Sequence, residues 1–277
     1  MTLSRRQVVD LLSSHGIRPS RALGQNFVAD PNTVRRIAAL ADVGTGDRVV
    51  EIGAGLGSLT LALAETGADV TAVEMDRRLL PLLRSVVAPA GVRVVEGDAT
   101  DLDWAAVLGP SDAWVLVANL PYNVATPLVL DLLAHVPAIS RMLVMVQREV
   151  AERLCAGVGD EAYGAVSVKV AYWAEASVVG RVPPTVFVPR PKVESALVRV
   201  VRRLRPVVDV DEHRLFTLVQ AGFAHRRKML RRALAGVVDD ATFAAAGVRP
   251  EARAEELDVQ TWGRLARCTT SAAPSPS

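Results

Sequence analysis

Cysteine is scarce in this sequence: the chain of 277 residues has two, Cys155 and Cys268. They lie far apart, and neither belongs to a CxxC pair or to a histidine pair at metal-ligand spacing. A disulfide framework and a zinc site are therefore not indicated, and we interpret both thiols as packing residues. We expect a site without a metal.

Long apolar runs are also missing. No stretch approaches the roughly 18 apolar residues that a membrane helix needs, and no apolar segment follows Arg5 and Arg6 to form a secretory signal. We therefore expect a cytoplasmic protein without a membrane partner. The length and the 50% content of hydrophobic residues are enough for one α/β domain and a second, smaller one.

The net charge is only +2, but it is unevenly distributed. Residues 199–232 contain ten Arg or Lys and three Asp or Glu, a local charge of +7, so the rest of the chain sums to −5. A basic segment on an otherwise acidic protein is typical of contact with nucleic-acid phosphates. The alternative is a solvated helix face.

Short apolar segments alternate with helical ones in the first half of the chain. A helix is predicted near the N-terminus, at 3–15, and another at 30–41, where Asp30-Pro31 forms its start. Predicted strands follow at 48–52, 69–74, 92–96, 113–118 and 142–147. The helices predicted among them are 58–66, 77–87, 126–134 and 148–157. This alternation predicts a parallel sheet covered by helices on both faces.

The pattern changes in the second half. Segment 166–173 fits a helix or a strand, and strands are predicted at 178–182 and 196–201, around a proline-rich loop. Helices are predicted at 211–224, 226–235, 241–246 and 260–267. We therefore divide the chain into a domain over 1–204 with an N-terminal helical extension, a small helical domain over 205–268 and a disordered tail over 269–277.

A glycine-rich turn, EIGAGLGS at 51–58, follows the strand predicted at 48–52. Glycine allows a tight turn and a close approach to a ligand, and the next helix presents free N–H groups. Ser58 stands where the dinucleotide fingerprint G-x-G-x-x-G has its last glycine, which disfavours NAD. A purely structural turn is the alternative.

Acidic residues follow at the next two strand ends. Glu74 closes the strand at 69–74, where a carboxylate can accept hydrogen bonds from ribose hydroxyls. Asp98 follows the strand at 92–96, within reach of an adenine amino group. Each alone is explained equally well as a helix cap. Because ligands of an open parallel sheet lie across the carboxyl ends of its strands, the turn and the two acids together resemble the S-adenosylmethionine site of Rossmann-like methyltransferases.

The strand predicted at 113–118 is followed by Asn119-Leu120-Pro121-Tyr122-Asn123, or NLPYN. Proline and asparagine are typical turn residues, so a turn alone would explain the backbone geometry of this segment. The motif also resembles the (Asn/Asp/Ser)-Pro-Pro-Tyr signature of methyltransferases that act on ring amino groups. Acceptors that bind the N–H groups of an adenine N6 amine aim its lone pair at the methyl group. The Asn119 side-chain oxygen and the Leu120 carbonyl are the candidates, and Tyr122 would stack on the base.

Four motifs resemble, in order, the family of ribosomal small-subunit RNA adenine dimethyltransferases. They are GQNF at 24–27, NLPYN, PRPKVES at 189–195 and FAHRRKML at 223–230. The resemblance implies a Rossmann-like S-adenosylmethionine-dependent methyltransferase domain with a small C-terminal helical domain. It also implies dimethylation of two adjacent adenosines near the 3′ end of 16S rRNA in an immature 30S particle. Nothing in the sequence requires more than a monomer.

The same resemblance assigns individual residues. The residues it places around S-adenosylmethionine are Asn26, Val28, Gly53, Glu74, Asp98 and Asn119. It gives Phe187 a share in base stacking with Tyr122, the alternative being a packing role for Phe187. The last motif commonly reads RRKTLRN in the family and here reads RRKMLRR, so two polar contacts are lost and charge is added.

Three other functions remain open on the sequence. An antibiotic-resistance methyltransferase of large-subunit rRNA shares the glycine turn and the asparagine-proline motif, but PRPKVES and RRKML weigh against it. A non-catalytic RNA-binding assembly factor would keep the fold without the chemistry. A nicotinamide dehydrogenase is disfavoured by Ser58.

Overall fold

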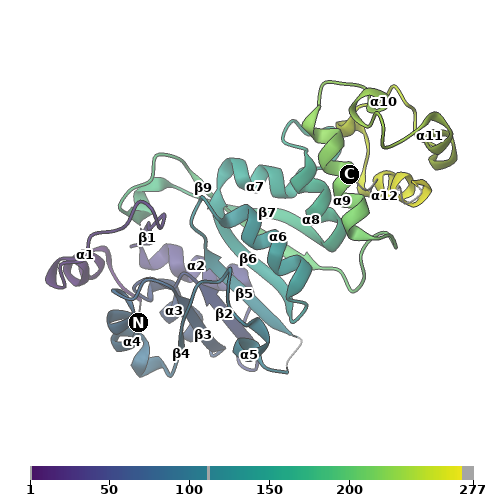
Figure 1. Cartoon of the computed structure of the whole chain (residues 1–277). Helices are drawn as coiled ribbons and strands as arrows, with labels where there is room; N and C mark the ends of the chain where they lie inside the picture. Colours follow the sequence, from purple (N-terminus) through teal and green to yellow (C-terminus); the bar gives the residue numbers. More distant parts are fainter. Residues whose placement is uncertain (1, 111–112, 270–277) are drawn as a thin grey trace, which may run out of the picture. The chain divides into compact units, whose positions relative to one another are not determined.

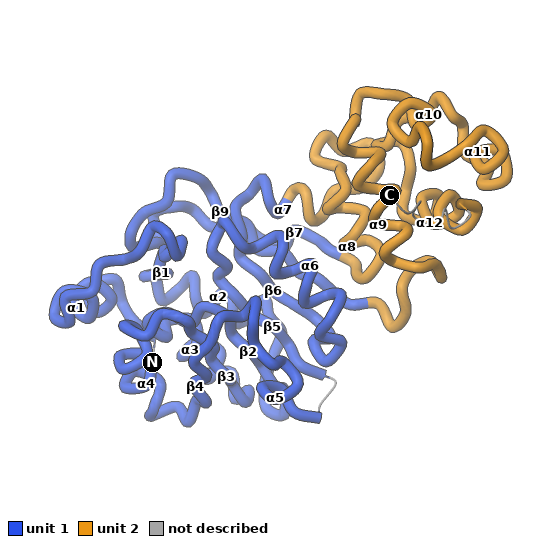
Figure 2. Tube along the Cα trace, viewed as in Figure 1, with its two compact units in different colours: residues 1–151, 176–202 blue, residues 152–175, 203–277 orange. Residues whose placement is uncertain are grey.

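The computed structural model describes residues 2–110 and 113–269. The chain divides into two compact units, the first formed by 1–151 and 176–202 and the second by 152–175 and 203–277 (Figure 2). The second unit thus includes 152–175, which the sequence analysis placed in the first domain. The physical reason is a shared core, because Tyr163, Val168 and Tyr172 pack in one hydrophobic cluster with residues of the C-terminal helices.

The first unit is built on a seven-stranded sheet with the strand order β4-β3-β2-β5-β6-β9-β7 (Figure 1). Its strands are β2 (Arg48–Ile52), β3 (Asp69–Glu74), β4 (Arg93–Glu96), β5 (Trp114–Asn119), β6 (Ile139–Gln147), β7 (Ala174–Val182) and β9 (Ser195–Arg202). Strands β2 to β6 pair in parallel, and β9 runs antiparallel to β6. The predicted α/β fold with a parallel sheet is confirmed.

Helices precede, connect and follow the parallel strands, mostly as the alternating pattern predicts. They are α2 (Pro31–Ala41), α3 (Ser58–Ala64), α4 (Leu80–Val87), followed by the 3-10 turn η1 (Ala88–Ala90), α5 (Trp104–Leu108), α6 (Ala125–His135) and α7 (Arg148–Cys155). The helix at 104–108 was not predicted. Helices α2 and α3 pack through Ile37 and Leu63 into one core with Val49 and Val117 of the sheet. The start of α2 is as predicted, because Asp30 accepts a hydrogen bond from the Thr33 N–H at 2.8 Å.

Two short strands that were not predicted bring distant parts of the chain together. The N-terminal α1 (Arg5–Ser14) is followed by β1 (Phe27–Val28), which pairs antiparallel with β8 (Phe187–Val188) just after the 3-10 turn η2 (Pro184–Val186). A two-residue strand has no periodicity for a sequence pattern to reveal. The pairing fixes the segment between α1 and α2 against the proline-rich loop.

The second unit is helical, with elements α8 (Ala165–Trp173), α9 (Glu212–Ala224), α10 (Leu230–Ala233), α11 (Asp240–Ala246), η3 (Ala254–Glu256) and α12 (Val259–Cys268). The ambiguous segment 166–173 is helix. The predicted helix 226–235 is wrong over its first residues, since helix forms only at α10 and the Lys228 N–H bonds the His225 carbonyl in a preceding turn, at 2.7 Å.

The predicted disordered tail begins at Thr269, and its remaining residues lie outside the described ones. Thr269 itself is buried and its N–H donates to the Leu265 carbonyl at 3.1 Å, so it closes α12. Across 2–110 and 113–269, no helix is both long enough and apolar enough to cross a membrane.

Candidate active site

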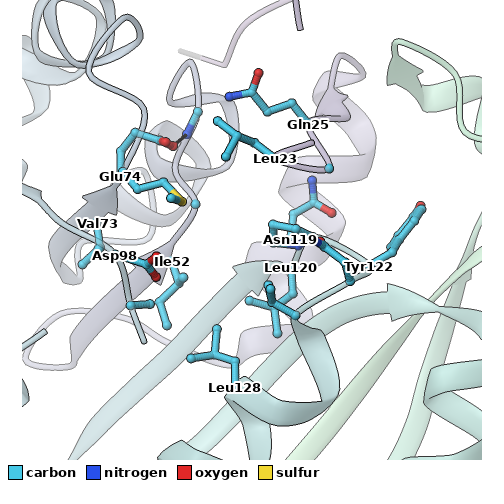
Figure 3. Close-up of a pocket in the computed structure, with 18 of the residues that line it drawn as sticks. Leu23, Gln25, Ile52, Val73, Glu74, Asp98, Asn119, Leu120, Tyr122 and Leu128 are labelled. Carbon is cyan, nitrogen blue, oxygen red and sulfur yellow. Dashed lines mark hydrogen bonds between the residues drawn. The ribbon is translucent and has the colours of Figure 1, made fainter. Parts of the chain in front are cut away.

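A cavity of about 230 Å³ lies beyond the carboxyl ends of β2, β3, β4 and β5 (Figure 3). Its lining includes most of the residues that the sequence singled out: Asn26, Gly53, Glu74, Asp98, Asn119, Leu120 and Tyr122. These come from the segment before β1 and from four strand ends. The cavity therefore occupies the position where open parallel sheets bind their ligands.

The glycine turn forms part of one wall of the cavity. Gly53 and Gly55 have φ angles of 73° and 59°, in the left-handed region that favours glycine. A Cβ atom at Gly55 would lie 2.9 Å from Cδ1 of Phe27, so any side chain there displaces that ring. The turn is thus shaped to let the backbone, rather than a side chain, face a ligand.

Glu74 ends β3 and holds two backbone loops together. Its Oε2 atom accepts a hydrogen bond from the Gly55 N–H at 2.7 Å, and its Oε1 atom accepts one from the Asp76 N–H at 2.8 Å. Burial raises the pKa of this carboxyl, and the bonds from the two N–H groups oppose the rise. Each oxygen keeps a further lone pair, which suits the hydroxyls of a ribose.

Asp98 lies just beyond β4 in a turn that it stabilises itself. Its Oδ1 atom accepts hydrogen bonds from the N–H and the hydroxyl of Thr100, at 3.0 and 2.9 Å. These bonds fix the orientation of the carboxylate at the edge of the cavity. The other oxygen, Oδ2, is then in place to accept a bond from an amino group.

Asn119 is the last residue of β5, and its amide orientation is set by one contact. The Nδ2 atom donates a hydrogen bond to the backbone carbonyl of Asn26 at 2.9 Å. Because a carbonyl can bind only the NH₂ end of the amide, Oδ1 is left as an acceptor. The next peptide is anchored as well, since the Leu120 N–H donates to the Met145 carbonyl at 3.1 Å.

Tyr122 lies at the side of the cavity near Asn119 (Figure 3). Its hydroxyl shares a hydrogen bond of 2.9 Å with Oγ of Ser195, the buried first residue of β9. Burial raises the pKa of Tyr122, and the bond to Ser195 opposes the rise. The tether fixes the ring at its far end, which leaves the ring itself as the contact surface.

Val28 and Phe187 are not brought to the cavity. They are partners in the β1–β8 pairing, with exposed fractions of 5% and 1%, and both belong to the core beneath α2 and α3. A packing role accounts for the burial of Phe187. Its predicted share in base stacking stays a prediction.

The sequence analysis missed other residues of the cavity wall. Met75 lines the cavity with a 45% exposed side chain, an apolar surface next to Glu74 that suits a purine ring. Gln25 and Leu128 also line it. Gln25 stood inside the GQNF motif and Met75 beside Glu74, so proximity to a recognised motif was the available signal.

The donor set matches S-adenosylmethionine in its parts. A glycine turn, the carboxylates of Glu74 and Asp98 and an apolar wall at Met75 all line one cavity, and such a set has groups suited to ribose hydroxyls, an adenine amine and a purine ring. This arrangement can hold a nucleoside, and Asn119, Leu120 and Tyr122 line the same cavity.

The comparisons with known proteins agree with this geometry. The sequence profile described as "Ribosomal RNA adenine dimethylase" matches residues 17–270. The chain is 50% identical over 280 residues to "Ribosomal RNA small subunit methyltransferase A" of Cutibacterium acnes, covering 95% of this chain and 91% of the relative. It is 48% identical over 274 residues to the protein of that name from Kineococcus radiotolerans, covering 95% and 90%.

Two solved structures share the fold. One, a dimethyladenosine transferase from Plasmodium falciparum, has a TM-score of 0.72 and 24% identity, covering 85% of this chain and 94% of that chain. The other, the 23S rRNA methyltransferase ErmE, has a TM-score of 0.68 and 27% identity, covering 88% and 99%.

Proposed function

The chain belongs to the ribosomal RNA adenine dimethylase family, and we propose that it dimethylates the N6 amines of two adjacent adenosines near the 3′ end of small-subunit rRNA. It is an S-adenosylmethionine-dependent rRNA methyltransferase. The observation that carries the chemistry is the Asn119 amide, whose Nδ2 atom is bound to the Asn26 carbonyl and whose Oδ1 atom remains an acceptor.

The choice of the small subunit is supported by the relatives. Two of them, at 50% and 48% identity over 95% of this chain, are named for the small ribosomal subunit. The structure named for 23S rRNA has 27% identity. The large-subunit activity is therefore the second candidate, and the experiment below separates the two.

Cofactor binding is assigned to the strand ends already described. We assign the ribose hydroxyls to Glu74, the adenine amine to Asp98 and one face of the adenine to Met75, which all line the cavity. The cofactor, when bound, supplies a methyl group on a positively charged sulfur, so no metal is needed to activate it.

Asn119 and Leu120 prepare the target amine. The N6 lone pair is delocalised into the ring, which makes it a poor nucleophile. When Oδ1 of Asn119 and the Leu120 carbonyl accept the two N–H bonds, the nitrogen is held with its lone pair directed at the methyl group. Both acceptors lie on rigid backbone, because β5 pairs with β6 up to Asn119 and Met145.

Tyr122 is assigned to the target base, and two substitutions test this. Tyr122→Ala removes a stacking contact worth about 1–3 kcal/mol, so kcat/KM is expected to fall about 5- to 150-fold. Tyr122→Phe keeps the ring and loses only the bond to Ser195, so it is expected to retain activity within about fivefold. Equal losses in both variants contradict a stacking role.

The larger partner is proposed to be an immature 30S particle, bound by a monomer in the cytoplasm. The second unit exposes Arg227, Lys228 and Arg232, which form no ion pair with any described residue. Such cations are available to rRNA phosphates and displace counterions on binding.

Labelled S-adenosylmethionine tests the proposed function directly. The wild-type chain is incubated with immature 30S particles, mature 30S particles lacking the modification, and 50S particles, and the rRNA is digested to nucleosides. We expect label in N6,N6-dimethyladenosine from the immature small subunit only. Label confined to large-subunit RNA would support the second candidate instead.

A further inference from the structure

The loop of residues 20–27, called the strap here, contacts three of the strand ends that form the cavity. Gln25 Nε2 donates a hydrogen bond to Asp76 Oδ2 beyond β3, at 2.8 Å. The Asn26 carbonyl accepts the bond from Asn119 at the end of β5. The Phe27 ring packs against Gly55 beyond β2. One loop thus links the cofactor end of the cavity to the reacting end.

Gln25 has both ends of its amide engaged, so its orientation is fixed. The side-chain Oε1 atom accepts a hydrogen bond from the Ser20 backbone N–H at 2.8 Å, and the backbone N–H of Gln25 donates to the Ser20 carbonyl at 3.0 Å. Together these bonds close the strap into a turn. Figure 3 shows Gln25 beside Leu23 on the wall of the cavity.

Asp76 is a rigid anchor for that amide. Its side chain is only 5% exposed, and its Oδ1 and Oδ2 atoms bind Nε and Nη2 of Arg78 at 2.9 and 2.6 Å. Its own N–H binds Glu74, the residue assigned to the ribose. The bonds from Arg78 and Gln25 lower the pKa of Asp76 to about 2, so the acceptor is ionised at every pH at which the protein would act.

The strap also touches the NLPYN motif at Gly24. A Cβ atom at Gly24, whose φ is 61°, would lie 3.0 Å from Cβ of Pro121 and 3.3 Å from Oδ1 of Asn123. The strap therefore lies against the NLPYN motif, directly after the two residues assigned to the target amine. Any shift of the strap is transmitted to Asn119 through the Asn26 carbonyl.

We propose that Gln25 and Asp76 are positioning residues for methyl transfer: their hydrogen bond holds the strap closed over the cofactor and thereby fixes the amide of Asn119. This inference rests on the proposed function. Without the bond the Asn26 carbonyl moves, the Asn119 amide can rotate, and its NH₂ group then faces the N–H groups of the substrate. Cofactor affinity and the rate of transfer fall together, although neither residue touches the reacting atoms.

The test uses the full chain and exchanges the two partners. Gln25→Glu places two carboxylates face to face, whereas Gln25→Glu combined with Asp76→Asn restores one carboxylate and one amide in the opposite order. We expect Gln25→Ala and Gln25→Glu to lower kcat about 10- to 100-fold, the loss typical of a misplacement of about 1 Å. The double variant is expected to recover much of this loss but not all of it, because the NH₂ group that faces the new carboxylate can no longer accept from Nη2 of Arg78, whose Nε keeps its bond to Oδ1.

Three further measurements separate positioning from simple destabilisation. Calorimetry with S-adenosylhomocysteine is expected to give a weaker Kd in both single variants and recovery in the double variant. Trypsin is expected to cleave after the exposed Arg21 faster in the single variants. Arg77→Ala, on the loop that follows β3, breaks only an exposed pair with Glu96 and serves as the control.

The outcomes are distinguishable. Single variants that keep wild-type kcat and Kd, or a double variant no better than Gln25→Glu, overturn the inference. A wild-type chain that binds S-adenosylhomocysteine but methylates no small-subunit adenosine overturns the proposed function instead. In that case the Kd and trypsin measurements still decide whether the Gln25–Asp76 bond closes the strap.

Discussion

Replacing Asn119 with alanine is expected to lower kcat about 10²- to 10³-fold, the loss seen when one preorganised hydrogen-bonding group is removed from a reaction centre. The side-chain oxygen is one of two acceptors assigned to the target amine, and the backbone cannot replace it. The Leu120 carbonyl alone holds one N–H, so the lone pair is no longer directed at the methyl group. Single-turnover methylation of immature 30S particles measures the effect without a contribution from product release.

The fold is expected to survive this substitution. Among the residues that the structure describes, the Asn119 side chain makes one hydrogen bond, to the Asn26 carbonyl, and the pairing of β5 with β6 involves its backbone only. Loss of one such bond costs about 1 kcal/mol. The same change at the exposed Asn32, on α2, is the control and is expected to leave kcat unchanged.

Asn119→Asp refines the assignment. Aspartate keeps an acceptor for the amine but cannot donate to the Asn26 carbonyl. The kcat of this variant is therefore expected to lie between that of the wild type and that of Asn119→Ala. If Asn119→Ala methylates at the wild-type rate, the amide is not the acceptor, and a non-catalytic reading of the NLPYN turn becomes the better one.

The strand ends of the site were predictable because their chemistry is local. A glycine turn, Glu74, Asp98 and NLPYN each follow an apolar segment directly in the sequence, and the carboxyl ends of parallel strands meet at one edge. The structure brings these residues to one cavity as that reasoning requires. Their roles toward cofactor and substrate stay predictions for the substitutions to test.

The rest depends on contacts between distant segments. Gln25 and Asp76 are 51 positions apart, and no periodic pattern links them. Nor does charge counting show which arginines are free: Arg202 lies in the basic segment, yet its guanidinium donates to the carbonyls of Leu132, Leu133, Val136 and Ile139. It stabilises the end of α6 and is not available to RNA. The basic segment counted from the sequence therefore overstates the surface charge.

Domain assignment failed at 152–175 for a similar reason. The segment continues from β6 and α7 in sequence, but Tyr163 donates its hydroxyl to the Leu257 carbonyl at 2.8 Å and Val168 packs with residues of α9 and α12. A sequence pattern reports which face is apolar and not which core that face joins.

Glu51 of β2 provides the second large effect, on stability. Its side chain is 2% exposed, and burial raises its pKa from 4.5 to about 8, with the nearby carboxylate of Glu74 adding to the rise. In the unfolded chain the carboxyl ionises near pH 4.5, whereas in the folded chain it keeps its proton up to about pH 8. Between these values the folded state binds more protons, so the free energy of unfolding falls as the pH rises.

Replacing Glu51 with glutamine is therefore expected to stabilise the fold at alkaline pH and to have little effect at acid pH. Glutamine stays neutral and, like the protonated carboxyl, has one donor and one acceptor end. The free energy of unfolding is expected to exceed that of the wild type by under about 1 kcal/mol at pH 5 and by on the order of 5 kcal/mol above pH 8. Urea unfolding of both proteins at pH 5 and pH 8.5 measures it, with the same substitution at the exposed Glu161 as the control. A gain that is equal at the two pH values would show that the pKa of Glu51 is the same in the folded and unfolded chains. A neighbouring group would then have to stabilise the buried carboxylate.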